Sequence, residues 1–570
     1  MEDFTQQDNT GQQLEHQSSH DVSNKITHGF FSESKPQIHI SISDYTKALI
    51  KVWTEGGKKP QVSPNRIFVS QTVSFLAFLY EKMRNAVEFR EEHLIRRAAI
   101  ERIIKRRMLL NENGRDIAEP LIKELLWARY YENGTIGEES VAKVQSTIDK
   151  YFFLRNEISA GRKRSEQEKI ASFTLEVLSC EIDEILSPSL VKREAFVHFV
   201  YQLVRQSLAP IKGNVQERDI QAYIAIERAF AHSDDSTIRY SILRLMIPEI
   251  SDISWQNADK ILPRYYEIYN EIEKNLVHPL RDKIRNFYKK QMPPFFILRD
   301  IFEQNPKTIE QILTDETTLK HKVDEACRKR YEETKSRLRR MGIRSFIYIL
   351  LTKVIFAFLI ELPYDIYVLK KIAYFPIIVN IIIPPVLMSI IILSVTVPGD
   401  ENTRKIYSFI RQIIEEDPEK LPSTFHPVSV DKYAKSKSVI FTALFTLFYL
   451  LTYLISFGAI IYVLTKLNFN PVSQGIFIFF ITLVTFFAFR VINITQEYLV
   501  IDRDSPLTPL VDFFFLPILR VGQWLSGEVL AKFNILIFLF DFIVEMPLKA
   551  VVEVIDEWVR FVKLKKEEII

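Results

Sequence analysis

Two long stretches without a charged residue limit what this chain can fold into. Residues 372–397 and 439–465 contain 26 and 27 consecutive residues, respectively, without Asp, Glu, Lys or Arg. At a rise of about 1.5 Å per residue, roughly 20 helical residues cross a hydrocarbon core of about 30 Å. Both stretches are too long and too apolar for core helices of a soluble domain, and they predict membrane-spanning helices.

Two further stretches bring the number of predicted spans to four. Residues 345–369 are apolar but carry charges, and residues 475–489 are uncharged. The first stretch reaches spanning length only if it continues beyond Pro363, and the second only with the residues that directly follow it. We therefore predict a four-span α-helical membrane domain over residues 341–500.

The first 340 residues are rich in charge and show a different pattern. Apolar residues such as Phe75, Leu79 and Met83 recur at intervals of three and four, which is typical of an amphipathic helix. Glycine is scarce, at 15 of 570 residues, as expected for a helical protein. We predict an all-α fold in which a disordered polar leader, residues 1–40, precedes a cytoplasmic helical domain, residues 41–340.

The C-terminal region, residues 501–570, is less regular. Its apolar runs, within residues 507–527 and 532–566, are about 8–12 residues long, which is short for a crossing. They predict re-entrant or interfacial helices followed by a cytoplasmic tail, with Trp524 and Trp558 as interface anchors. The alternative is a fifth and a sixth half-length span that form a hairpin.

Basic residues predict the orientation in the membrane. Residues 328–344 contain eight basic and two acidic residues directly before the first span, and the connection 398–438 contains seven basic residues. Because basic flanks stay on the cytoplasmic side, we expect both termini in the cytoplasm. The predicted partners are the lipid bilayer and its anionic headgroups. The arginines expected at the membrane surface are Arg337, Arg339, Arg340 and Arg344.

A second basic cluster lies at residues 82–107, with nine basic and four acidic residues. It is interpreted as a solvated helix face or, alternatively, as a surface for anionic lipid. The stretch lacks the interleaved aromatic residues that single-stranded nucleic acid needs for stacking. Lipid is therefore preferred over RNA, and no nucleic-acid partner is predicted.

The first span contains charges in an otherwise apolar segment. Lys353 lies about 12 Å into the helix, and Glu361 lies about 12 Å further and some 80° around it, so these two side chains are not expected to meet. Glu361 and Asp365 share a face if the helix continues. Two interpretations remain open. Lys353 extends toward the headgroups while the carboxylates mark the span's edge, or the three form a functional polar site.

A short echo of this segment occurs near the C-terminus. The order Glu-Leu-Pro at Glu361 is matched by Glu-Met-Pro at Glu545, and Asp541 precedes Glu545 by one turn. Paired broken helices of this kind line transporter sites. We expect Lys353 to pair with Asp541. The intramembrane polar candidates are Lys353, Glu361, Asp365, Asp541 and Glu545.

No common catalytic or phosphate-binding motif occurs in the sequence, and its two cysteines have no metal-binding spacing. No catalytic residue, cofactor or metal site is therefore predicted. The leading hypothesis is a non-enzymatic integral membrane scaffold, tether or assembly factor, with an unidentified protein partner for the helical domain. The alternative is a transporter or channel subunit with a polar path lined by intramembrane Lys and carboxylates. A membrane enzyme is the weakest of the three.

Overall fold

A computed structural model describes most of the chain. The described residues are 39–55, 65–70, 74, 75, 78, 81, 92–110, 114–187, 190–395, 398–418, 428–429, 439–500, 508–531, 554, 558, 561 and 562. Over these residues the protein consists of helices, with isolated bridges and no strand, which confirms the all-α prediction. The predicted leader lies outside them apart from residues 39 and 40.

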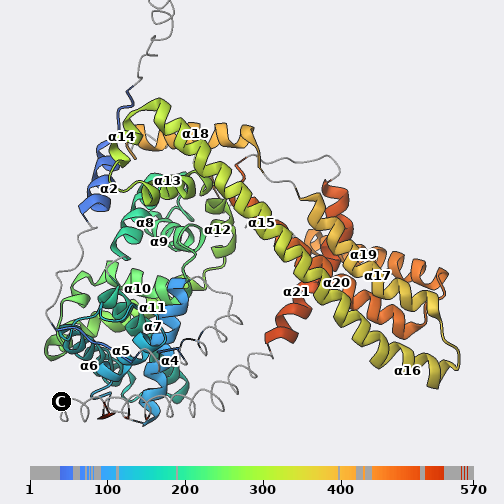
Figure 1. The fold of residues 1–570 in the computed structure, drawn as a ribbon, viewed down its shortest axis with the longest axis horizontal. Helices are drawn as coiled ribbons and strands as arrows, with labels where there is room; N and C mark the ends of the chain where they lie inside the picture. Colours follow the sequence, from blue (N-terminus) through green and yellow to red (C-terminus); the bar gives the residue numbers. More distant parts are fainter. Residues whose placement is uncertain are drawn as a thin grey trace, which may run out of the picture.

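The first part of the chain forms one packed group of helices (Figure 1). We call this group, α2 to α14 with the first half of α15, the helical unit. Its α-helices are α2 (Asp44–Glu55), α4 (Glu92–Leu110), α5 (Ala118–Trp127), α6 (Glu139–Ser159), α7 (Arg164–Leu186), α8 (Leu190–Val204), α9 (Val215–Ala229), α10 (Asp235–Met246), α11 (Leu262–Leu276), α12 (Arg281–Lys289), α13 (Pro293–Gln304) and α14 (Ile309–Thr314). Short 3₁₀ turns are η1 (Arg205–Ser207), η2 (Pro248–Ser251) and η3 (Trp255–Ile261).

Local sequence explains where these helices begin and what they bury. Asn214 and Asp234 cap α9 and α10 by accepting a hydrogen bond from the backbone N–H three residues on. In α11 the buried side chains, among them Tyr265, Ile268 and Ile272, recur at intervals of three and four and face the core. The resulting core is continuous across the helical unit.

Helix α15 (Glu316–Phe356) connects this unit to the membrane spans as one 41-residue helix (Figure 1). It begins at the capping residue Asp315 and would extend about 60 Å at 1.5 Å per residue. Its first half buries Val323 and Cys327 in the helical unit, and its second half buries Leu338 and Ile349 among the spans. The predicted domain boundary at residue 340 therefore falls inside a helix and not in a linker.

The second half of α15 and the helices after it, without α18, form what we call the membrane unit. Its elements are η4 (Ala357–Glu361), α16 (Leu362–Tyr364), η5 (Asp365–Leu369), α17 (Tyr374–Ser394), α19 (Val439–Lys466), α20 (Pro471–Thr495) and α21 (Thr508–Ala531). Among the described residues, four helices are long and apolar enough to cross a membrane, as predicted: Glu316–Leu369, Tyr374–Leu393, Ile440–Lys466 and Pro471–Phe489. Helices α15, α17 and α20 pack together, and α21 packs against α20 and α19.

Two segments between and after the spans return to the helical unit. The amphipathic helix α18 (Asp400–Glu415) follows α17 and buries Ile406, Ile410 and Ile414 in the core of the helical unit. The 3₁₀ turn η8 (Gln496–Tyr498) follows α20 and also packs on α13. The chain thus comes back to the same unit after each pair of candidate spans.

Helix α21 contains the first of the short apolar runs predicted for the C-terminal region, with Phe513–Leu525 as its apolar part. It is a single 24-residue helix that packs against α20. The absent Cβ of Gly522 would lie 2.3 Å from the backbone oxygen of Thr482, so only glycine allows this close approach. Trp524 on α21 is exposed. Most of the predicted second segment, 532–566, lies outside the described residues.

Candidate intramembrane polar site

The charged stretch of the first span is helical throughout but changes its helical type three times. After α15 the chain makes two π-helical turns, η4 and η5, separated by the short α16. Pro363 lies in α16, and because proline has no backbone N–H and clashes with the carbonyl four residues earlier, a regular α-helix cannot continue through it. Short π-helical segments of this kind are frequent at functional sites.

Lys353 and Glu361 are joined through a third side chain, Asn380 of α17. The Lys353 ammonium donates a hydrogen bond to Oδ1 of Asn380. Nδ2 of Asn380 donates to Oε1 of Glu361 at 2.7 Å and to the backbone oxygen of Ser473, on α20, at 3.3 Å. The Ser473 hydroxyl lies 3.4 Å from Oε2 of Glu361. One amide therefore connects a cation on α15 to a carboxylate on η4 and to the start of α20.

Asp365 forms the outer end of the same cluster. Its carboxylate accepts a hydrogen bond from the backbone N–H of Ala373 at 3.0 Å and from Nδ2 of Asn470 at 2.9 Å. Oδ1 of Asn470 in turn accepts from the backbone N–H of Ser473 at 2.8 Å, in the first turn of α20. Asp365 thus holds together the connection before α17 and the start of α20.

These polar groups are removed from solvent and from the lipid-facing surface. Lys353, Asp365 and Asn380 are each 0% exposed, and Glu361 and Ser473 are each 1% exposed. The Lys353 ammonium also lies 4.2 Å from the centre of the Phe480 ring, where a cation is attracted by the ring's negative face. Buried charges of this kind need a charged or hydrogen-bonding partner nearby, and here each has one.

The expectation that Lys353 and Glu361 do not meet holds for direct contact, because Asn380 lies between them, but it did not foresee that both reach this one amide. It assumed a regular α-helix, in which eight residues leave the two side chains about 80° apart. A π-helical turn contains an additional residue and so rotates less per residue. The η4 turn brings Glu361 back toward the face of Lys353, where both reach Asn380.

The sequence reasoning did not single out Asn380, Asn470 or Ser473. Asn380 stands in the middle of an uncharged run, and Asn470 and Ser473 read as loop residues before the fourth span. The one sequence feature that could have pointed to this site is Asn380, a lone asparagine inside a predicted span. The predicted candidates Asp541 and Glu545, and with them the pairing of Lys353 with Asp541, lie outside the described residues.

The arrangement can bind and orient the helices that contribute to it. Over the residues that the structure describes, no group of three or more His, Cys, Asp or Glu side chains is placed to hold a metal ion. The site contains a cation, two carboxylates and amides, which can exchange protons or hold helices together. It joins three helices: α15 with its π-helical extension, α17 and α20.

These three helices lead, at their other ends, to a second polar contact region, which we call the junction. Asn402 of α18 donates to the Tyr331 hydroxyl of α15 and to the backbone oxygen of Tyr498 in η8, at 2.9 and 2.8 Å. Oδ1 of Asn402 accepts from the backbone N–H of Val500 at 2.8 Å. One asparagine in the segment after the first span pair thus bonds both α15, before the spans, and the segment after the second pair.

A histidine of the helical unit also takes part in the junction. His232 lies 3.0 Å from the Glu497 carboxylate of η8 and stacks on Phe296. Burial raises the pKa of Glu497, but the contact with His232 and the positive charges of Lys289 and Arg337 lower it more, so the net pKa lies below its usual value. Glu497 is therefore held in its charged form.

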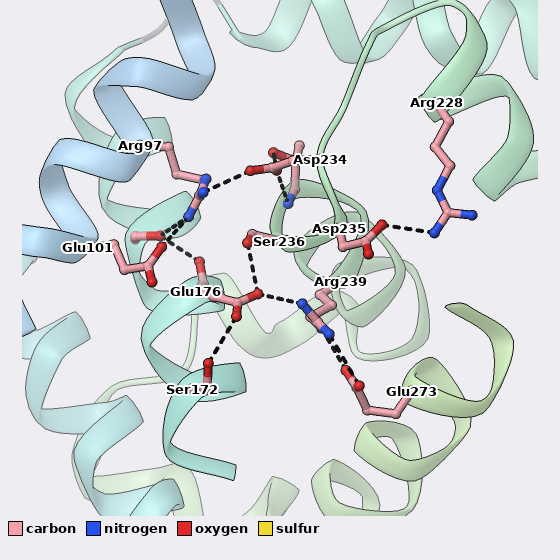
Figure 2. A network of polar contacts seen from close by, with 12 residues as sticks. Arg97, Glu101, Ser172, Glu176, Arg228, Asp234, Asp235, Ser236, Arg239 and Glu273 are labelled. Carbon is pink, nitrogen blue, oxygen red and sulfur yellow. Dashed lines mark hydrogen bonds and ion pairs between the residues drawn. The ribbon is translucent and has the colours of Figure 1, made fainter. Parts of the chain in front are cut away.

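The described arginines of the basic cluster at residues 82–107 lie within 96–107 and have a third explanation, different from both predicted ones. Figure 2 shows Arg97 between Glu101 and Asp234, with ion-pair distances of 2.7 and 2.8 Å. Other arginines of the cluster pair in the same way: Arg96 with Asp183, Arg102 with Glu81, and Arg106 and Arg107 with Glu124. These arginines serve internal ion pairs of the helical unit and are not a free lipid-binding surface.

The same network continues toward α10 and α11. Arg239 bridges Glu176 and Glu273 (Figure 2), and Arg244 bridges Glu184 and Glu194. Burial and the neighbouring carboxylates outweigh the charge of Arg244 and raise the pKa of Glu194 to about 7. The helical unit therefore contains one carboxyl group that titrates near neutral pH.

Comparisons of the chain with protein-family models, with curated proteins and with solved structures find no match.

Proposed function

We propose that this protein is an integral membrane scaffold that holds its helical unit at a fixed position and orientation relative to the bilayer. The observation that carries the proposal is that the helical unit and the spans share their packing. One helix, α15, is buried in both, and α18 completes the core of the helical unit. A domain tethered by a flexible linker would have neither feature.

The two polar contact regions support the same proposal. The intramembrane site ties α15, α17 and α20 together near one end, and the junction ties the segments that continue these helices near the other. Two separated attachment regions restrict tilting of the helical unit. Because both regions consist of buried hydrogen bonds, loss of either one leaves unpaired polar groups.

The proposed topology places the helical unit, α18 and the basic first half of α15 on the cytoplasmic side. The return of the chain to the helical unit after α17 and after α20 supports two crossings in each pair. The basic residues before the first span support the cytoplasmic assignment. We propose that the helical unit binds a protein partner there.

Distance measurements between spin labels test the fixed orientation. Val277 in the helical unit and Tyr367 at the far end of the first span are both well exposed, and the two native cysteines are buried. A Val277→Cys/Tyr367→Cys protein can therefore be labelled at these positions. In nanodiscs we expect one narrow distance distribution. Insertion of four glycines after Ser336 is expected to broaden it. A broad distribution in the protein without the insertion contradicts the proposal.

A transporter or channel subunit is the second candidate function. The observation that favours it is the buried Lys353 with two carboxylates inside a candidate span, because ionisable groups there often line ion or proton paths. Proton and monovalent-cation uptake into proteoliposomes distinguishes the two functions. A scaffold gives no uptake above that of empty liposomes. Uptake that Lys353→Met abolishes would favour the transporter and overturn the scaffold.

A further inference from the structure

Three arginines form one stripe on the surface of α15 where it approaches the first span. At about 100° per residue, Arg337, Arg340 and Arg344 lie within roughly 60° of one another around the helix. All three are exposed. Within the described part of the chain, Arg337 and Arg344 make no hydrogen bond or ion pair, and Arg340 donates to the Ser336 hydroxyl at 2.8 Å. The guanidinium groups of Arg340 and Arg344 are thus available to an outside ligand, and that of Arg337, whose charge also acts on Glu497, lies one turn further along.

The same face of α15 becomes apolar as it enters the span. Tyr348 follows Arg344 by one turn and is 67% exposed, and Leu351 and Ile355 follow with 58% and 52% exposure. The order along this face is therefore guanidinium, phenol and hydrocarbon. That order matches a phospholipid at a membrane surface, where the phosphate, the interface and the acyl chains follow one another with depth. A nucleic acid or an acidic peptide would match the arginines alone.

The opposite face of α15 carries basic residues without this continuation. Lys335 and Arg339 are exposed and lie about 100–180° around the helix from the arginines of the stripe. Further along the helix this face becomes buried: Leu350 is half-buried, and Lys353 is fully buried in the polar site. Ile343 and Ile347, one and two turns after Arg339, are still 53% and 50% exposed, but beyond them this side is buried, so its apolar surface is shorter than that of the stripe.

We propose that Arg340 and Arg344, with Arg337 one turn further from the membrane, bind the phosphate of an anionic phospholipid whose acyl chains lie along Leu351 and Ile355. Arginine suits this role because its planar guanidinium forms two parallel hydrogen bonds to a phosphate. Of the four arginines that the sequence places at the membrane surface, Arg339 is outside this site. The inference holds for a scaffold and for a transporter alike.

Native mass spectrometry of the full chain in detergent, with added phosphatidylglycerol, tests the site. The matched control is Lys335→Gln/Arg339→Gln, which removes two charges at the same spacing from the opposite face of the same helix. We expect Arg340→Gln/Arg344→Gln to weaken phosphatidylglycerol binding roughly 30-fold, from the typical contribution of a basic residue near an anionic headgroup. The control is expected to change binding less than threefold. Circular dichroism checks that each variant is folded.

Two further measurements distinguish an anionic phospholipid from a zwitterionic lipid and from free phosphate as the ligand. Phosphatidylcholine is expected to bind without a difference between the variants, and millimolar inorganic phosphate is expected not to displace phosphatidylglycerol. Arg340→Lys/Arg344→Lys keeps both charges and is expected to retain part of the affinity for phosphatidylglycerol. This variant still tests the site if the glutamine variant fails to fold. Equal losses in both double glutamine variants, or displacement by inorganic phosphate, would overturn the proposal.

Discussion

Removing either charge of the Lys353–Glu361 pair tests whether the intramembrane site holds the spans together. Lys353→Met leaves the Glu361 carboxylate buried, at 1% exposure, without a cation nearby. Glu361→Gln leaves the Lys353 ammonium buried without the carboxylate that shares the Asn380 amide with it. The double variant removes both charges. If the two groups interact through Asn380, the double variant is more stable than the sum of the two single losses implies.

The geometry gives the expected size of the effect. The Lys353 ammonium bonds the oxygen of the Asn380 amide, and the Glu361 carboxylate bonds its nitrogen. One hydrogen bond on each side of the amide places the two charges about 6 Å apart. At that separation, an effective dielectric constant of about 20 gives an attraction of about 3 kcal/mol. Removing one member of a buried pair typically costs about 3–5 kcal/mol. We expect each single variant to lose about that much and the double variant to recover about 3 kcal/mol of the summed loss.

The free energy of unfolding is measured in mixed micelles of increasing dodecyl sulfate fraction, with circular dichroism following the loss of helix. Ser456→Ala is the control, because the Ser456 hydroxyl on α19 is buried and has no hydrogen-bond partner among the described residues. It is expected to change stability by less than about 1 kcal/mol. Additive losses of the two single variants would refute the reasoning and make the bridging amide a coincidence of packing.

Three other predictions address the junction, the helical unit and α21. Asn402→Ala should cost about 1–3 kcal/mol of unfolding free energy, because it leaves buried donors and acceptors unpaired, whereas Ala at the exposed Ser408 should be neutral. The pKa of Glu194 is raised to about 7, so the folded state holds a proton that the unfolded state releases, and stability falls as pH rises from 4.5 to about 7. Glu194→Gln should flatten that slope in chemical denaturation at several pH values. Gly522→Leu should lower the melting temperature in detergent because its Cβ would clash with the α20 backbone, whereas Gly458→Leu, with open space around it, should not.

The composition of the spans made the fold class predictable. Runs of 26 and 27 uncharged residues leave few alternatives to a membrane helix, and α17 and α19 begin and end within a few residues of those runs. The continuity of α15 was less visible, because a basic stretch followed by an apolar stretch resembles a domain boundary. The contribution of α18 to the core of the helical unit depends on a contact between distant segments, which one sequence does not show.

The site was predictable only in part. Lys353, Glu361 and Asp365 were identified because charge in an apolar segment is expensive. The Asn380 amide that joins Lys353 and Glu361 was not identified, because Asn380 is uncharged and 27 residues from Lys353 in the sequence. The π-helical turns were also hidden, because they follow from Pro363 together with the packing of α17 and α20, and periodicity alone assumes a constant rotation per residue.

The unbroken course of α15 makes the number of its residues a structural parameter. Tyr331 meets Asn402 at the junction and Lys353 meets Asn380 in the membrane, both from the same helix. Each added residue turns one end about 100° relative to the other, so a single insertion between them cannot satisfy both contacts. Seven added residues nearly restore the angular phase but displace the helical unit by about 10 Å. The length of α15 can therefore change only in steps of about two turns, and each step moves the helical unit farther from the bilayer.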